Sequence, residues 1–289
     1  MKTRPTFGRS PRRCTRKSRG CCRPHRARAD RSRGLDLAPV AVVTGAASGM
    51  GSLAARRLLD SGWQVAAVDL PGATYALLAD HAGFHRFACD VSEADQVAAT
   101  AAAITERLGR VDRLVNAAGI AVAGPIDQVP AARFAAVMSV NYLGTVHWVK
   151  AVLPAMRSRN SGEIVLFASL AGWFATPNMG AYTATKFAVV GFAETLKLEL
   201  DGSGVTLRCV CPPGVQTPML DDILRHNAPK GALKVLKPIT VQQVLDAIDA
   251  SLARPRAGMY VFPGRGSATV WRLRRFTPGL LDAALRRLL

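Results

Sequence analysis

Short apolar runs alternate with segments of helical periodicity from residue 39 to residue 262. The apolar runs predict strands at 39–44, 63–69, 84–90, 111–119 (with its loop), 162–169, 205–214 and 258–262. The periodic segments predict helices at 49–62, 73–81, 92–109, 130–158, 180–200 and 240–253. Because Val/Ile/Leu-rich strands that alternate with helices are typical of a parallel sheet covered on both faces, the pattern predicts a doubly wound α/β fold.

No linker interrupts this series between residues 39 and 263. We therefore expect one domain over 37–263, preceded by a leader over 1–36 and followed by a C-terminal extension over 264–289. In doubly wound sheets, ligands bind beyond the carboxyl ends of the strands, where the strand order reverses. Residues that directly follow the predicted strands are thus the first candidates for a functional site.

The glycine-rich sequence TGAASGMG follows the first predicted strand, and two registers of it fit a dinucleotide-binding turn. Gly49-Met50-Gly51 followed by Ala54 matches the G-x-G-x-x-A pattern, but it begins four residues after the strand. The register Gly45-x-x-x-Gly49-x-Gly51 begins where the strand ends and the turn is needed, and we favour it. In either register, the glycines let the backbone approach a pyrophosphate at a helix N-terminus.

Asp69 ends the second predicted strand, 24 residues after Gly45. A carboxylate at this position accepts hydrogen bonds from the ribose hydroxyls of an adenosine and repels a 2′-phosphate. Residues 45–51 contain no Lys or Arg that would hold such a phosphate. The sequence thus favours NAD over NADP, and a helix-capping role for Asp69, next to Pro71 and Gly72, is the plainer alternative.

Tyr182 and Lys186 lie four residues apart in the predicted helix 180–200, so they share one face of that helix. Such a pair alone often means only a surface lysine beside an aromatic ring. The other strands are followed by residues each of which, taken singly, indicates a turn. These residues are Asp90, Val91, Asn116, Ala117, Gly119, Ser169, Pro213, Gly214, Val215 and Thr217.

Taken together, these positions resemble the short-chain dehydrogenase/reductase family in its compact single-domain branch. The resemblance covers about residues 38–263. It rests on the glycine turn, Asp90, NAAG at 116–119, Asn141, Ser169, Tyr182-x-x-x-Lys186 and PPGVQT at 212–217. The spacing of 13 residues from Ser169 to Tyr182 makes it specific. Ala117 departs from the family, which usually has a second Asn there. This departure weakens a contact on the adenine side and leaves the chemistry untouched.

The resemblance implies a Rossmann-fold oxidoreductase that transfers a hydride between a nicotinamide cofactor and a secondary alcohol or ketone. It makes Tyr182 the general acid/base, with Lys186 favouring the phenolate and holding the nicotinamide ribose. Ser169 would orient the substrate oxygen, and Asn141 would hold a water that links Lys186 to solvent. The implied cofactor-binding residues are Thr44, Gly45, Ser48, Gly49, Met50, Gly51, Asp69, Asp90, Val91, Asn116, Ala117, Gly119, Tyr182, Lys186, Pro213, Gly214, Val215 and Thr217. An NADPH-dependent lipid carbonyl reductase and a non-catalytic dinucleotide sensor are the alternatives.

The net charge of +18 is concentrated at the two ends of the chain. Residues 1–34 contain 13 Lys/Arg and one acid, residues 251–289 contain eight Arg and one acid, and residues 35–250 are close to neutral at −1. Because a nucleic-acid-binding domain carries its basic residues on the folded body, this distribution argues against a nucleic-acid partner. The leader has almost no apolar residue to bury, so we expect it to be disordered.

The six cysteines show no metal-ligand spacing with a His partner, so we expect no metal site and a reducing compartment. Residues 37–55 are uncharged for 19 positions, but glycine and hydroxyl residues interrupt them, and a strand followed by a turn explains them better than a membrane span. A cytoplasmic protein is therefore expected.

The segment 217–238 follows the last candidate site residues and is expected to cover the site as a lid. Its apolar residues favour a lipophilic substrate, although lids are often apolar only to exclude water. They are Met219, Leu220, Ile223, Leu224, Leu233, Val235 and Leu236.

The extension 267–289 predicts a helix that begins at Thr277-Pro278, with Arg residues beside an apolar face. The apolar face consists of Leu281, Ala284, Leu285 and Leu288, preceded by Trp271, Leu273 and Phe276. Three alternatives fit: contact with an anionic membrane, a flap over the partner subunit of a homo-oligomer (dimer or tetramer), and packing on its own subunit. Of the first two we favour membrane contact, and the third is about as well supported as both together.

Overall fold

The computed structural model describes residues 38–225, 237–254, 257–279 and 283. These residues belong to one compact unit that begins at Ala38. The expected leader at 1–36 and most of the expected C-terminal helix lie outside the described residues. The division of the chain near residues 37 and 263 therefore stays a prediction.

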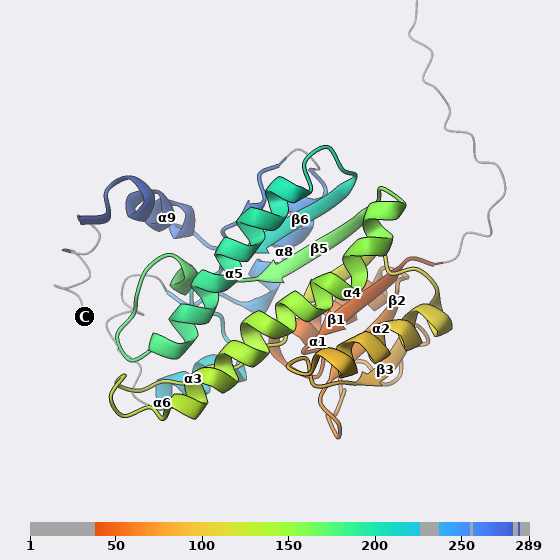
Figure 1. Cartoon of the computed structure of the whole chain (residues 1–289), viewed down its shortest axis with the longest axis horizontal. Coiled ribbons are helices and arrows are strands. Elements are labelled where there is room, and N and C mark those ends of the chain that lie inside the picture. The colour runs from red at the N-terminus through yellow and green to blue at the C-terminus, as the bar shows by residue number, and fades with distance from the viewer. Residues whose placement is uncertain (1–37, 226–236, 255–256, 280–282, 284–289) are drawn as a thin grey trace, which may run out of the picture. The chain divides into compact units, whose positions relative to one another are not determined.

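A single sheet of seven parallel strands forms the centre of the described unit (Figure 1). The strands are β1 (Val40–Thr44), β2 (Gln64–Asp69), β3 (Phe84–Ala88), β4 (Arg113–Asn116), β5 (Gly162–Phe167), β6 (Val205–Val210) and β7 (Tyr260–Val261). Their order is β3-β2-β1-β4-β5-β6-β7, so the order reverses between β1 and β4. This confirms the doubly wound α/β fold and places the point where ligands bind beside the end of β1.

Helices cover both faces of the sheet. α2 (Ala94–Leu108), α4 (Gly144–Ser158) and α5 (Gly180–Glu199) pack on one face, and α1 (Gly49–Asp60) and α8 (Val241–Leu252) pack on the other. Figure 1 shows α4 and α5 running in front of the strands. α3 (Ala131–Met138) continues through a π-helical turn (Ser139–Leu143) into α4, so the predicted segment 130–158 is helical from Ala131 onward. A 3-10 turn (Leu170–Gly172), α6 (Pro218–Arg225) and α9 (Ser267–Phe276) are the other elements needed below.

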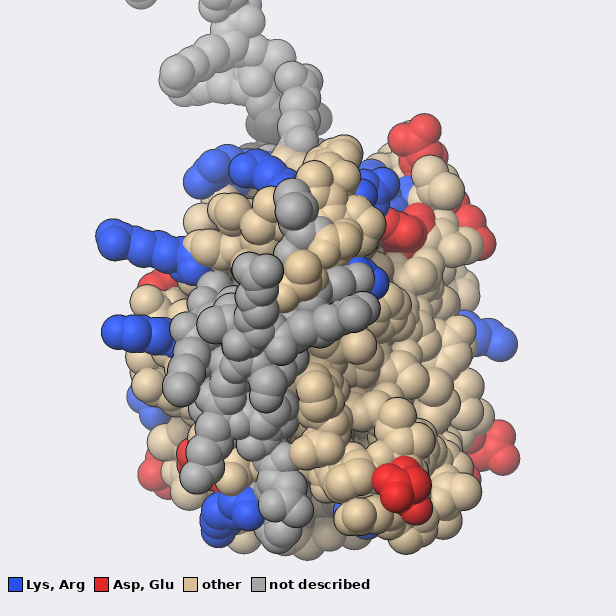
Figure 2. All heavy atoms as spheres, turned by 90° about the vertical axis from the view of Figure 1, so that its left-hand side faces the viewer, with Lys and Arg blue, Asp and Glu red and all other residues tan. Residues whose placement is uncertain are grey.

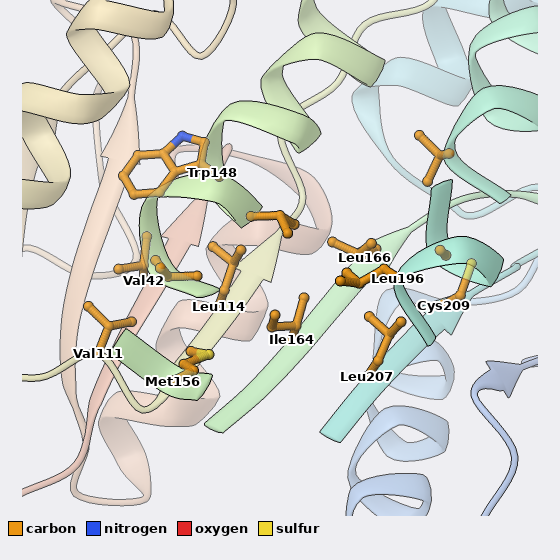
Figure 3. Packing of buried hydrophobic residues seen from close by; sticks show 14 of the residues in the cluster. Val42, Val111, Leu114, Trp148, Met156, Ile164, Leu166, Leu196, Leu207 and Cys209 are labelled. Carbon is orange, nitrogen blue, oxygen red and sulfur yellow. The ribbon is translucent and has the colours of Figure 1, made fainter. Parts of the chain in front are cut away.

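The alternation along each strand divides the core into two apolar layers. Val42 packs in the layer of α4 with Leu114 and Trp148, while the next residue, Val43, packs in the layer of α1 and α8. Figure 3 shows Trp148 over Val42 and Leu114, with Ile164 further along the sheet. Full burial of one such aliphatic side chain contributes about 1.5–3 kcal/mol, so these layers fix the strand ends that carry the site.

Residues 76–80 form a turn and the rest of 73–81 has no regular structure, so the predicted helix there is wrong. The amides of Leu78 and His81 bond to carbonyls three residues back, those of Tyr75 and Leu78, at 2.9 and 3.1 Å. The side chains of Tyr75 and Leu78 are buried in the layer of α1. Two buried anchors in a short link after Pro71-Gly72 thus override the helical propensity of this segment.

α9 runs from Ser267 to Phe276, so it ends just before the predicted helix start at Thr277-Pro278 and is a helix that the sequence analysis did not expect. The first residue of α9 is bonded to the segment that precedes the helix: the Ser267 hydroxyl donates to the Pro263 carbonyl at 2.7 Å. Pro278 and Gly279 are also helical, whereas Leu281, Ala284, Leu285 and Leu288 lie outside the described residues. Within the described ranges, no helix is long and apolar enough to cross a bilayer.

Candidate active site

A cavity of about 210 Å³ lies at the carboxyl ends of β4, β5 and β6. Many of the candidate residues line it, although they come from segments far apart in the sequence. These lining residues are Met50, Ala117, Gly119, Ser169, Tyr182, Lys186, Pro213, Gly214, Val215 and Thr217. The fold therefore brings the predicted catalytic side chains and part of the predicted cofactor site together.

A larger cavity, of about 400 Å³, lies at the opposite edge of the sheet between α1 and α8. Its charged side chains neutralise one another: Arg57 contacts Asp249 at 3.0 Å and Arg113 contacts Glu163 at 2.5 Å. No candidate residue lines this cavity, and it lies away from the strand ends where ligands bind in this fold. We therefore take the smaller cavity as the candidate active site.

Tyr182, Lys186 and Ser169 form the polar wall of the smaller cavity. Helix α5 presents Tyr182 and Lys186 one turn apart, with the lysine Nζ 5.4 Å from the centre of the tyrosine ring. The hydroxyls of Tyr182 and Ser169 are hydrogen-bonded. The ammonium of Lys186 donates to the Phe167 carbonyl at 2.8 Å, which ties α5 to the end of β5.

Burial sets the protonation of both α5 residues. It raises the pKa of Tyr182 to about 12, and the hydrogen bond with Ser169 lowers that pKa only in part. Burial lowers the pKa of Lys186 to about 8, against the influence of Cys209 and Cys211, which raise it. The lysine was expected to favour the phenolate. In the protein alone, burial of the phenol outweighs any such effect, so Tyr182 carries its proton at neutral pH.

Ser169 is held in place by the loop after β5. It caps the 3-10 turn, and its Oγ accepts from the amide of Ala171 at 3.1 Å. The carbonyl of Pro212 lies 3.5 Å from the same oxygen, and the Leu170 amide donates to that carbonyl at 2.9 Å. The loops after β5 and β6 together therefore fix the hydroxyl beside Tyr182.

Asn141 lies in the π-helical turn and is buried. Its side-chain oxygen accepts from the Ile120 amide at 2.8 Å, and its nitrogen donates to the Ile120 carbonyl at 2.9 Å and to Thr185 Oγ1 at 3.1 Å. The residue thus joins the loop after β4 to α5, one residue before Lys186. A π-helical turn widens the helix locally and is frequent at functional sites. A Cβ at Gly119 would lie 3.2 Å from the Asn141 oxygen, so glycine suits this close approach.

The glycine turn presents backbone atoms, because glycines occupy its key positions. Gly45 and Gly49 have φ angles of +66° and +54°, in the left-handed region that glycine adopts most easily. A Cβ at Gly51 would overlap the carbonyl oxygen of Gly45. Ser48, in extended conformation, precedes α1, whose first-turn amides open toward the turn. Each glycine of the favoured register therefore has a steric reason, and the turn fits a pyrophosphate.

Asp69 is already hydrogen-bonded within the protein. Its two carboxylate oxygens accept from the amides of Ala47 and Leu70, both at 2.9 Å. Asp69 therefore ties the glycine turn to the end of β2, a contact that sequence reasoning did not anticipate. Each carboxylate oxygen has a second lone pair, which leaves acceptor capacity for ribose hydroxyls.

Thr44 and Asn116 support the strand ends from inside the fold. Thr44 Oγ1 accepts from the Ala118 amide at 3.0 Å and donates to the Asn116 side chain at 3.2 Å. Asn116 donates to Thr145 at 2.8 Å, and Thr145 donates to the Asn141 carbonyl at 2.7 Å. Thr145 was not anticipated, because a threonine within an apolar helix gives no signal of its partners.

Asp90 and Val91 form the turn after β3. The Asp90 carboxylate accepts from the amide and the hydroxyl of Ser92 at 2.9 and 2.7 Å. Val91 is buried against α4, where a Cβ at Gly144 would lie 2.9 Å from its side chain. Both residues lie at the carboxyl edge of the sheet but do not line the cavity.

The loop after β6 closes the cavity from the other side. The side chain of Thr217 lies 3.6 Å from where a Cβ would stand at Gly49, so this loop meets the glycine turn. Met219, Leu220, Ile223 and Leu224 of α6 line the cavity, as the lid interpretation expects. The other expected lid residues, Leu233, Val235 and Leu236, lie outside the described residues. The loop between β5 and α5 adds Phe174, Thr176 and Met179, which sequence reasoning missed.

The comparisons with known proteins agree on one family. A model described as short chain dehydrogenase matches residues 39–228, which include every candidate site residue. The chain is 39% identical over 208 residues to the D-threitol dehydrogenase of Mycolicibacterium smegmatis, over 69% of this chain and 78% of that protein. It is 37% identical over 206 residues to the 2-dehydro-3-deoxy-L-rhamnonate dehydrogenase (NAD(+)) of Sphingomonas sp., over 68% of this chain and 83% of that protein. A solved short chain dehydrogenase/reductase from Burkholderia phymatum, in complex with NAD, matches with a TM-score of 0.72 at 29% identity, over 84% of this chain and 95% of that chain.

Proposed function

The chain belongs to the short-chain dehydrogenase family, and on that premise we propose that it is an NAD(H)-dependent oxidoreductase that interconverts a secondary alcohol and a ketone. One observation carries this proposal. Ser169, Tyr182 and Lys186 meet on one wall of a cavity that Met50, from the glycine turn, also lines. A group that moves a proton thus lies beside a turn shaped for a dinucleotide.

Each catalytic side chain has a role that its surroundings support. Tyr182 donates a proton to the carbonyl oxygen during reduction and accepts one from the hydroxyl during oxidation. Ser169, bonded to the same phenol, orients the substrate oxygen. Lys186, when protonated, stabilises the phenolate through its charge. A bound nicotinamide cofactor supplies or accepts the hydride.

NAD is the cofactor that the residues around the glycine turn fit best. Gly45, Gly49 and Gly51 leave room for a pyrophosphate, and Asp69 stands at the end of β2 where the adenosine ribose would lie. The position after Asp69 is Leu70, an exposed apolar side chain that offers no charge to a 2′-phosphate. The relative from Sphingomonas is itself named as an NAD(+) enzyme.

A screen of secondary alcohols with NAD⁺ and NADP⁺, followed by NADH or NADPH absorbance, tests the activity. We expect turnover with NAD⁺ and a loss of about 100-fold or more in kcat for Ser169→Ala with NADH binding retained, because its hydroxyl lies beside the phenol of Tyr182 and away from the glycine turn. A wild type that binds NADH yet turns over none of the alcohols or ketones would favour the dinucleotide-sensor alternative.

The substrate we propose is lipophilic. Around the polar wall, the cavity is lined by apolar side chains from three segments: Leu170, Phe174, Met179, Met219, Leu220, Ile223 and Leu224. A pocket with apolar walls and a few convergent polar groups suits a substrate with one oxygen and a hydrocarbon body. Comparing kcat/KM for long-chain secondary alcohols, cyclohexanol and D-threitol decides this point. If D-threitol is the best of these substrates, the lipophilic assignment is wrong.

A homo-oligomer is supported by the outer face of α5. Phe187 and Leu198 are 45% and 78% exposed on this helix, and a Cβ at Gly191 between them would meet nothing within 4 Å. Two exposed apolar side chains beside a position without a side chain allow a second copy of the chain to approach closely. Light scattering should show a dimer or tetramer for the wild type and a smaller species for Gly191→Arg. A monomeric wild type at micromolar concentration would exclude this proposal.

Peripheral membrane contact through the C-terminal extension is the last part of the proposal. On α9, Phe276 is 73% exposed and Leu273 is 42% exposed, next to the exposed Arg272 and Arg275. Figure 2 shows Lys and Arg side chains along the top and the left-hand side of this face of the molecule, with Asp and Glu side chains at its upper right. Exposed apolar residues among arginines suit an anionic lipid surface. Equal sedimentation of the full chain and a 1–266 truncation with anionic liposomes at low salt would exclude this contact.

A further inference from the structure

Four aromatic rings from three separate segments meet at the loop that follows Ser169. Trp173 comes from that loop, Tyr260 and Phe262 from β7 and its end, and Trp271 from α9. Trp173 lies edge-on to Tyr260 and to Trp271, with ring centres 5.1 and 5.8 Å apart. Trp271 also packs on Phe262 at 5.0 Å. Figure 1 shows α9 beside the loop between β5 and α5.

Polar contacts fix the same cluster at defined atoms. Arg274 of α9 donates from Nε to the Trp173 carbonyl at 3.1 Å. The indole nitrogen of Trp173 lies 3.5 Å from the sulfur of Cys211, at the end of β6. The Tyr260 hydroxyl donates to Glu194 of α5 at 2.6 Å. Contacts from β7, from α9 and from the end of β6 therefore fix the ring of Trp173, and α9 also fixes its carbonyl.

Trp173 lies between two residues of its loop that line the substrate cavity, Ser169 and Phe174. Ser169 lies four residues before it, and the next residue, Phe174, lines the substrate cavity. The amides of Gly172 and Trp173 bond back to the carbonyls of Ser169 and Leu170 at 3.0 and 2.9 Å. Because the turn is this tight, a displacement of Trp173 also moves Ser169 and Phe174.

We propose that α9 is a positioning element for the active site, in which Trp271 and Arg274 hold Trp173 and thereby fix Ser169 and Phe174 relative to the substrate. This inference rests on the proposed oxidoreductase function. α9 lies beyond residues 39–228 that the family model matches, as do α8 and β7. The edge-on ring contacts supply directional packing, which resists rotation of the loop better than area burial alone.

The experiment compares Trp271→Ala, Trp271→Phe and Arg274→Ala, with Phe276→Ala as the matched control on the exposed side of the same helix. For Trp271→Ala we expect kcat/KM for the alcohol to fall on the order of tenfold, through both kcat and KM, because small displacements of reacting groups lower the rate steeply. NADH affinity should stay within about twofold, since the glycine turn does not contact α9. Trp271→Phe should recover most of the loss, and Arg274→Ala should show a smaller decrease. Phe276→Ala should equal the wild type.

Hydrogen exchange of residues 170–179 provides a readout that does not depend on catalysis. Exchange there should accelerate in Trp271→Ala and Arg274→Ala and stay unchanged in Phe276→Ala. If both variants keep wild-type exchange in this loop together with wild-type kcat and KM, the positioning role is wrong. If the wild type has no oxidoreductase activity, the proposed function fails, and the exchange measurement still decides whether α9 orders the loop.

Discussion

Around β1 and β2, the candidate site consists of backbone atoms and of glycines, which have no side chain. Gly45, Gly49 and Gly51 form the turn there, and Asp69 holds the turn through the Ala47 amide. Around β5 and α5, the site is made of side chains whose chemistry burial has changed. The pKa of Tyr182 is raised to about 12 and that of Lys186 is lowered to about 8.

The difference teaches where each kind of substitution acts. On the glycine side, a new atom overlaps the backbone of the turn and its neighbours, so the turn is displaced and binding is lost before chemistry is affected. On the α5 side, the removal of one oxygen or nitrogen leaves the space intact, so chemistry is lost before binding is affected. Variants on the two sides should therefore separate NADH affinity from turnover.

Tyr182→Phe should have the largest effect. We expect kcat to fall by about 1,000-fold or more, because the variant keeps the ring but lacks the only proton donor assigned to the reaction. NADH affinity, measured by fluorescence titration, should stay within about threefold. A variant that keeps more than a few per cent of activity would mean that another group donates the proton.

Gly51→Ala should have the next largest effect, and it should act on NADH binding at the glycine side. Its Cβ would overlap the Gly45 carbonyl, so the first turn of α1 has to shift away from the glycine turn. We expect NADH affinity to fall by about 100-fold together with a lower melting temperature. Gly258→Ala is the matched control, because a Cβ there meets nothing within 4 Å. Unchanged NADH affinity in Gly51→Ala would show that the glycine turn is not part of the cofactor site.

The pH dependence should differ between the two directions of the reaction. Oxidation needs the phenolate of Tyr182, and a pKa raised to about 12 leaves little phenolate at neutral pH, so kcat/KM for the alcohol should rise up to tenfold per pH unit below about pH 8. Above about pH 8, Lys186 loses its proton and its support of the phenolate, so the rise should flatten. Reduction uses the protonated phenol and should change little between about pH 6 and pH 8. A rise in the reduction rate with pH would contradict this assignment.

Asp69→Ala should have the smallest effect, and it lies on the glycine side. Loss of the carboxylate should shift the ratio of kcat/KM for NAD⁺ over NADP⁺ about tenfold toward NADP⁺. Loss of the bonds to Ala47 and Leu70 should lower the free energy of unfolding by about 1–2 kcal/mol. Asp69→Asn keeps one acceptor oxygen, so it should recover part of the stability without the charge. A wild type that prefers NADP⁺ would refute the ribose argument.

The sequence was sufficient for the elements whose determinants are local. The strand ends and the Tyr182–Lys186 spacing depend on apolar runs and on helix periodicity, and both appear in the structure at the expected places. The glycine register could also be chosen from the sequence, because a turn is needed directly after β1. Each of these features depends on neighbours within about seven residues.

The features that sequence reasoning missed depend on distant partners. Residues 73–81 contain good helix formers, but burial of Tyr75 and Leu78 decides their conformation. The contact of Asp69 with Ala47 joins residues 22 positions apart, and the contact of Arg274 with Trp173 joins residues 101 positions apart. The high pKa of Tyr182 follows from burial by several segments, which no single motif encodes.

The position of β1 in the sheet has a consequence for the order in which the protein folds during synthesis. β1 is made first, yet it lies between β2 and β4, and its residue Val42 pairs with Leu114, 72 positions later. Pairing across such a distance is slow, and the open edge of β1 is exposed until β4 emerges from the ribosome. The cluster around Trp173 completes only when α9 emerges near the end of the chain. A nascent chain that stops before residue 267 is therefore expected to form the cofactor side well before its catalytic loop becomes ordered.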